Sequence, residues 1–163
     1  MNKILFFGSL IFLGACGGTD DFGPPSTEYV PVMMLRSDME AAVLQQPPRE
    51  ISDPAKIYAY GDFLLISEKF QGIHVINNQD PARPSNIGFV RIPGCVDMAV
   101  RGTTLFADNA TDLISLDVSD PTDVKLISRV KDAFPVLLPP DLGLIPETYQ
   151  NRPEDMIIIE WRK

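Results

Sequence analysis

Two stretches of this chain repeat each other at a spacing of forty residues. The first stretch is Gly72–Pro81, GIHVINNQDP, and the second is Asp112–Pro121, DLISLDVSDP. Each alternates apolar and polar residues like a β-strand and then runs into an Asp-Pro turn, with the turn aspartates at Asp80 and Asp120. Self-similarity at about 40 to 45 residues is typical of β-propellers, in which one repeat forms one four-stranded blade. The spacing therefore predicts an all-β fold made of consecutive antiparallel units.

Strand-like segments fill both units. The expected strands are at 56–60, 63–67, 72–77 and 86–92 in the first unit, and at 96–100, 104–107, 112–118 and 124–130 in the second. Short strands separated by turn residues indicate antiparallel pairing. We therefore predict a partial β-propeller of about two blades over residues 56–134. A closed propeller needs about four to eight blades, so two units leave open edges.

The flanking segments are expected to cover those edges. Residues 29–55 form an N-terminal extension with an edge strand at 29–35 and a short helix at about 38–44, where the spacing of Ser37 and Glu40 predicts a capping box. Residues 135–163 contain a proline-rich stretch without secondary structure and a terminal strand of high β-propensity, MIIIEW. An uncovered strand of this kind invites pairing with another chain. The alternative is a truncated version of a larger protein.

The first sixteen residues have the layout of a signal peptide. Lys3 precedes an apolar run at 4–13 that is too short to span a bilayer, and the run ends in LGAC, with the cysteine at Cys16. These four residues resemble the lipobox of bacterial lipoproteins, in which the cysteine is lipidated and becomes the mature N-terminus. An ordinary signal peptide with an incidental cysteine is the alternative. We predict a lipoprotein signal peptide over 1–15, lipidation of Cys16, and a flexible tether over 16–28.

A lipid anchor predicts a location in the cell envelope, at the outer membrane. Asp20 and Asp21 in the tether resemble surface-export signals of some Gram-negative lipoproteins, and a solvated linker explains them equally well. The chain has 14 Lys and Arg residues against 22 Asp and Glu residues, for a net charge of −8. An acidic chain without a basic run is not expected to bind nucleic acid. The predicted partners are the membrane, through the anchor, and a protein or glycan.

Few residues in the chain are candidates for chemistry. His74 is the single histidine and is expected to be a hydrogen-bonded strand residue, and Cys95 is expected to be an inert, buried thiol. Asp108, Asn109 and Asp112 carry oxygen ligands at a spacing that could converge on calcium. A structural turn is the preferred interpretation of these three, because such side chains bond to their own backbone. No catalytic residue, metal or cofactor is predicted.

The repeats also resemble a known motif. DLISLDVSDP at 112–121, and more loosely the stretch at 72–81, are similar to the LVIVD repeat of bacterial surface and secreted proteins. AKIYAY at 55–60 and IPGCVDMAV at 92–100 are similar to the surrounding frame of uncharacterised LVIVD-repeat lipoproteins. The resemblance covers residues 29–161 and implies a propeller-like fold and an envelope location, without an established activity. Members of this family commonly carry more repeats than this chain.

Two classes of function follow from these patterns. We favour a non-catalytic envelope lipoprotein whose propeller-like domain is a binding or interaction module. The first alternative is a metal-dependent or hydrolase-like propeller enzyme, which an ordered cleft containing Asp97, Asp108 and Asp112 would favour. The second alternative is a truncated, non-functional fragment of a larger LVIVD-repeat protein.

Overall fold

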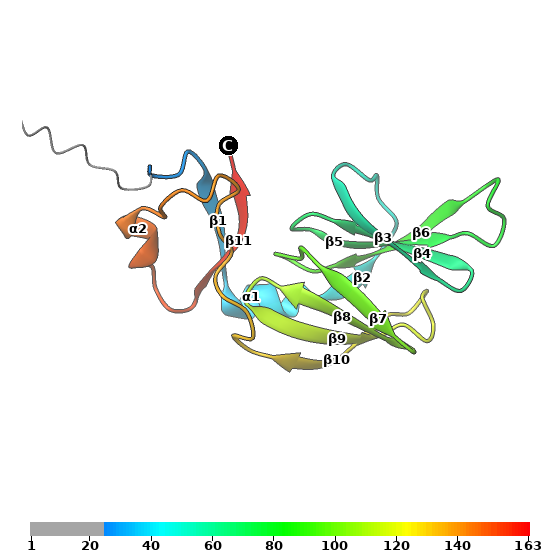
Figure 1. The fold of residues 1–163 in the computed structure, drawn as a ribbon. Coiled ribbons are helices and arrows are strands. Elements are labelled where there is room, and N and C mark those ends of the chain that lie inside the picture. Colours follow the sequence, from blue (N-terminus) through cyan, green and yellow to red (C-terminus); the bar gives the residue numbers. More distant parts are fainter. Residues whose placement is uncertain (1–24) are drawn as a thin grey trace, which may run out of the picture.

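The computed structural model describes residues 25–163, and its regular structure is mainly antiparallel β-sheet (Figure 1). This part of the chain contains three sheets, which we call the first sheet, the second sheet and the terminal sheet. Their strand orders are β2-β6-β5-β4-β3, β10-β9-β8-β7 and β1-β11, in that order. The all-β class predicted from the repeat spacing is confirmed.

The first sheet contains the four strands expected of the first unit. They are β3 (Pro54–Tyr60), β4 (Phe63–Glu68), β5 (Gly72–Asn77) and β6 (Ser85–Arg91), each antiparallel to the next. A fifth strand, β2 (Leu44–Gln46), pairs with β6 and was not predicted. Its three residues, Leu-Gln-Gln, have no strand-like alternation. The extended conformation of β2 is therefore set by its hydrogen bonds to β6 and not by its local sequence.

The second sheet contains the four strands expected of the second unit. They are β7 (Met98–Arg101), β8 (Thr104–Asn109), β9 (Asp112–Asp117) and β10 (Lys125–Val130). The turns that suggested the repeat have the same construction in both units. The Asp80 carboxylate accepts a hydrogen bond from the N–H of Ala82 at 3.1 Å, and the Asp120 carboxylate accepts one from the N–H of Thr122 at 2.9 Å.

The main core lies between the first and second sheets. One face of each sheet contributes to it, and the buried members of this cluster include Leu65, Ile73, Val75 and Val90 from the first sheet and Met98, Leu105, Ile114 and Leu116 from the second. Because strand side chains alternate between faces, each sheet also has an outer face that points away from this core. The pocket described below lies on the outer face of the second sheet.

The terminal sheet joins the two ends of the described chain. β1 (Val30–Leu35) pairs antiparallel with β11 (Met156–Arg162), and Val30 lies opposite Arg162. Both segments were predicted as strands. They pair with each other in a separate sheet (Figure 1), so they do not add strands to the first or second sheet.

The predicted short helix is present, but its predicted cap is wrong. Helix α1 spans Arg36–Ala41 and buries Met39, and Leu35 stands at its N-cap without a side-chain hydrogen bond. The N–H of Arg36 instead donates to the carbonyl oxygen of Asp155 at 2.7 Å. This tertiary contact satisfies a helix-end amide that the capping box would have satisfied, so the helix begins earlier than Ser37.

The proline-rich segment between β10 and β11 contains more regular structure than predicted. It contains the one-turn helix α2 (Glu147–Gln150), although no secondary structure was expected there. Its start is held by the indole N–H of Trp161, which donates to the carbonyl oxygen of Leu137 at 3.0 Å. Farther along, Asp141 accepts a hydrogen bond from the Thr27 hydroxyl at 2.8 Å. These long-range bonds fix the path of a segment whose own sequence specifies no regular structure.

Gly72 can be tested as a position that only glycine fits. It has φ +144°, and a Cβ added there would lie 2.1 Å from the carbonyl oxygen of Val90. We expect Gly72→Ala to lower the free energy of unfolding by ~2 kcal/mol or more, measured by urea unfolding, because backbone must move. Gly61 has φ +55° with nothing within 4 Å, so Gly61→Ala should cost only about 1 kcal/mol. Equal losses would contradict the close approach.

Candidate functional site

The predicted lipidation site lies outside the described residues. This holds for Cys16, the signal peptide, and the acidic pair at Asp20 and Asp21. Within residues 25–163, no helix is both long enough and apolar enough to cross a membrane. The candidate site is therefore built from the two sheets and the segment that follows β10.

His74 is a buried, hydrogen-bonded strand residue, as expected. Its Nε2 lies 2.9 Å from a carboxylate oxygen of Glu68, and its Nδ1 lies 3.3 Å from the side-chain nitrogen of Asn86. Arg49 pairs with Glu68 and stacks over the Phe89 ring at 3.8 Å. These contacts join strands β4, β5 and β6 to the segment before β3.

Glu68 is kept ionised at the centre of this cluster. Burial alone would raise the pKa of the Glu68 carboxyl. Hydrogen bonds from Ser52, Arg49 and His74 outweigh the burial and lower that pKa from 4.5 to about 2. The whole arrangement is internally satisfied, and it serves to hold the segment 49–52 against the first sheet.

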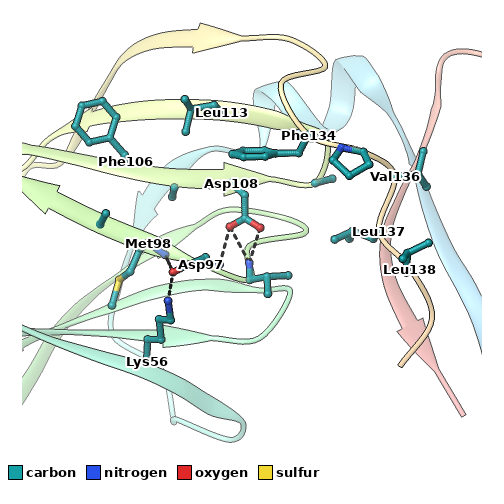
Figure 2. Close-up of a pocket in the computed structure, with 15 residues that line it drawn as sticks. Lys56, Asp97, Met98, Phe106, Asp108, Leu113, Phe134, Val136, Leu137 and Leu138 are labelled. Atoms are coloured by element: carbon teal, nitrogen blue, oxygen red, sulfur yellow. Dashed lines mark hydrogen bonds and ion pairs between the residues drawn. The ribbon is translucent and has the colours of Figure 1, made fainter. Parts of the chain in front are cut away.

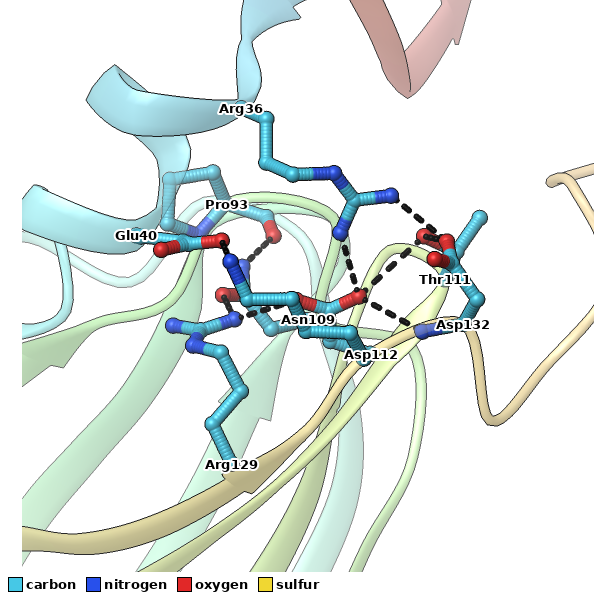
Figure 3. A network of polar contacts seen from close by, with 9 residues as sticks. Arg36, Glu40, Pro93, Asn109, Thr111, Asp112, Arg129 and Asp132 are labelled. Atoms are coloured by element: carbon cyan, nitrogen blue, oxygen red, sulfur yellow. Dashed lines mark hydrogen bonds and ion pairs between the residues drawn. The ribbon is translucent and has the colours of Figure 1, made fainter. Parts of the chain in front are cut away.

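Asp112 forms a second buried acidic centre (Figure 3). Its side chain is fully buried at the start of β9, and one oxygen accepts from Arg36 and the other from Arg129, both at 2.8 Å. Burial would raise the pKa of Asp112, but the N–H of Asp132 and the two guanidinium groups outweigh it and lower the pKa. In this arrangement both carboxylate oxygens have cationic partners.

Two of the three residues considered for calcium, Asn109 and Asp112, converge on the guanidinium of Arg129, whereas Asp108 bonds elsewhere. Asn109 donates to the carbonyl oxygen of Pro93 at 2.5 Å, and its own oxygen accepts from Arg129 at 2.7 Å. Asp108 accepts from the N–H groups of Val96 and Asp97 at 2.9 and 2.8 Å. Among residues 25–163, no three His, Cys, Asp or Glu side chains gather in a way that could hold a metal ion.

Cys95 is a buried thiol, as expected. Its side chain is fully buried within the main core. Burial, reinforced by the neighbouring Asp108 charge, raises the pKa of the Cys95 thiol well above its ordinary value. The protonated thiol is a poor nucleophile, so Cys95 serves as a core residue.

A pocket of about 670 Å³ lies beside the second sheet (Figure 2). Side chains from β8 and β9 form one wall, and the segment 134–138 forms the other. Apolar residues dominate the lining, and they include Ala99, Phe106, Leu113, Phe134, Val136, Leu137 and Leu138. The shape and lining suit an apolar group, because ligand sites are typically concave and mostly apolar with a few polar groups.

A small charged group lies at the rim of this pocket. Lys56 of β3 forms an ion pair with Asp97 at 2.5 Å, and its hydrogen bond lowers the pKa of the Asp97 carboxyl. Burial raises the pKa of the neighbouring Asp108. Asp112 belongs to the separate buried network. The pocket therefore contains Asp97 and Asp108, which are two of the three aspartates whose presence in one cleft would favour the enzyme alternative.

Sequence reasoning missed the pocket wall at 134–138. These residues lie in a proline-rich stretch that was interpreted as irregular. The available signal was the apolar run Val136-Leu137-Leu138, which is unusual in a solvated loop. Only the three-dimensional path of the chain places this run opposite Phe106 and Leu113.

Comparisons with known proteins return no relative for this chain. No protein-family model, curated protein or solved structure matches it.

The Glu68 cluster makes a testable pH prediction. Because the folded-state pKa is lowered from 4.5 to about 2, ionised Glu68 contributes about 3 kcal/mol of stability above pH 4.5. That contribution is lost as the pH falls through this range toward 2. We expect Glu68→Gln to be destabilised by this order at pH 7 and to approach the native protein at pH 2.5, in urea unfolding at both pH values.

The matched control for this prediction is Glu154→Gln. Glu154 is exposed, and its replacement should leave the free energy of unfolding unchanged at both pH values. A loss for Glu68→Gln that stays the same from pH 7 to pH 2.5 would contradict the assignment.

Proposed function

We propose that this chain is a non-catalytic lipoprotein of the cell envelope, with a propeller-like domain of LVIVD type that binds another molecule. The observation that carries the binding role is the apolar pocket beside the second sheet, which has a single ion pair at its rim. The candidate chemical residues are engaged in structural contacts, whereas the pocket is open. An apolar lining favours the apolar side chains of a protein partner over a glycan.

The arrangement of the first and second sheets supports a partial propeller of two blades. Each is a four-strand antiparallel meander, apart from the added β2, and the two pack face to face. Their first strands, β3 and β7, approach each other, since the Tyr58 hydroxyl donates to the carbonyl oxygen of Val100 at 3.3 Å. In a propeller the blades surround a common axis, and the first strands of neighbouring blades lie close together.

The envelope location is supported by the sequence of the first sixteen residues. An apolar run that ends in LGAC predicts lipidation of Cys16, and several acyl chains would hold an acidic domain at a membrane surface. The outer membrane is the proposed destination. In this location the domain would be tethered close to other envelope proteins.

The lipid anchor has a matched pair of variants, because the chain has only two cysteines. We expect cells fed an alkyne-tagged fatty acid to label the native protein and Cys95→Ala, and not to label Cys16→Ala. Globomycin, which blocks the lipoprotein signal peptidase, should leave a larger precursor of the native protein. Labelling that persists in Cys16→Ala would overturn the anchor.

The pocket has its own matched pair. Leu138 and Leu142 lie in the same segment and are 64% and 74% exposed, but only Leu138 lines the pocket. We expect an apolar fluorophore, titrated into the purified protein, to bind with an affinity that Leu138→Asp lowers by about tenfold, because a charge desolvated in an apolar site costs on the order of 1.4 kcal/mol or more. Leu142→Asp should bind like the native protein, and equal binding by all three proteins would overturn the pocket.

A further inference from the structure

The outer face of the second sheet is equivalent, strand by strand, to the face of the first sheet that packs in the main core. Strand register places three residues that line the pocket at positions equivalent to three residues of the main-core side of the first sheet. The equivalent pairs are Tyr58 and Ala99, Leu65 and Phe106, and Ile73 and Leu113. The second sheet covers this face of the first sheet, and Leu65 and Ile73 are fully buried as a result. The pocket therefore lies where a further sheet would pack.

The outer face of the first sheet has the complementary character. Ile57 in β3 is equivalent to Met98 in β7, because each pairs with the equivalent residue of the next strand. Met98 is only 7% exposed because it packs against the first sheet, whereas Ile57 is 67% exposed. Ala59, next on the same face, is also exposed. Farther across this face, His74 and Phe89 are fully buried, and Arg49 stacks over the Phe89 ring. The part of the outer face that is free to form the equivalent contact is therefore the exposed side along β3.

The charges at the rim of the pocket are also complementary between the two sheets. Within the chain, Lys56 of the first sheet forms an ion pair with Asp97, the residue just before β7. These two residues occupy equivalent positions, just before Ile57 and Met98. A copy packed on the second sheet would therefore bring its own Lys56 toward Asp97, which places opposite charges together.

We propose that the partner in the pocket is a second copy of this chain, packed head to tail, with the exposed β3 side of its first sheet on the outer face of the second sheet. This inference rests on the proposed binding function and names its partner. The contact is heterologous, since it joins two different surfaces, and such contacts continue into a ring or a filament. Confinement of the copies to a membrane surface favours the contact by raising their effective concentration.

Cross-linking of the lipidated full chain in its membrane tests this proposal. The intrachain contact of Tyr58 with Val100 has its intermolecular equivalent in Ala99 of one copy and Ala59 of the next. Two differently tagged chains, each with Cys95→Ala, would carry Ala59→Cys and Ala99→Cys separately. A short bis-maleimide should join the two tags when the chains are expressed together, and either chain expressed alone should give few dimers. One chain with both substitutions should give a ladder of bands.

Ile57→Asp supplies the second arm of the experiment. Added to the chain with Ala59→Cys, it should reduce the cross-linked product at least fivefold, and Leu142→Asp in the same chain should leave the product unchanged. Retention of the product with Ile57→Asp would overturn the proposal. So would failure of the two tags to join, efficient joining of Ala99→Cys chains to each other, or cross-linking of Ala99→Cys to a different protein.

Failure of this inference is distinguishable from failure of the binding function. The fluorophore titration with Leu138→Asp reads the pocket alone and does not depend on a second copy. Sensitivity to Leu138→Asp without cross-linking would leave a binding module with a different partner and would reject the second copy.

Discussion

The buried carboxylate of Asp112 is the interaction on which the arrangement of the described chain depends. It receives Arg36 from the start of α1 and Arg129 from β10, so it ties the terminal sheet and the second sheet to one point (Figure 3). Removing one partner of a buried ion pair leaves the other charge buried without a partner and lowers the free energy of unfolding by about 3 to 5 kcal/mol. The first sheet has an analogous centre in Glu68, which Arg49 holds. The Glu68 centre attaches the irregular segment 49–52 to the first sheet, whereas the Asp112 centre attaches helix α1 to the second sheet.

The strands of the two units were predictable because each unit carries its own turn chemistry. Asp80 and Asp120 close their turns with bonds to the backbone two residues on, and this local signal repeats at forty residues. Alternation between the turns then gave strand positions within about two residues at most ends. The buried character of His74 and Cys95 also followed from their places in or between strands.

Features that depend on distant contacts could not be predicted. Strand β2 exists because β6 offers an edge, and α1 begins at Arg36 because Asp155 accepts its N–H. The pocket wall formed by Leu137 is held by the Trp161 indole. In each case the determining group lies far away in the sequence, so no local window contains the information. The candidate site was hidden for the same reason, because the segment 134–138 meets the second sheet only in the folded chain.

Strand β1 pairs with β11, which is the last described strand of the chain to be synthesised. During synthesis β1 emerges early, but its hydrogen-bonding edge and the buried side chain of Met39 stay uncovered until β11 is available. Such long-range pairing is slow to form. A product that stops before residue 156 would expose the strand edge next to the predicted tether, where proteases and chaperones can act on it. The terminal sheet can therefore form only after residues 156–162 have been synthesised.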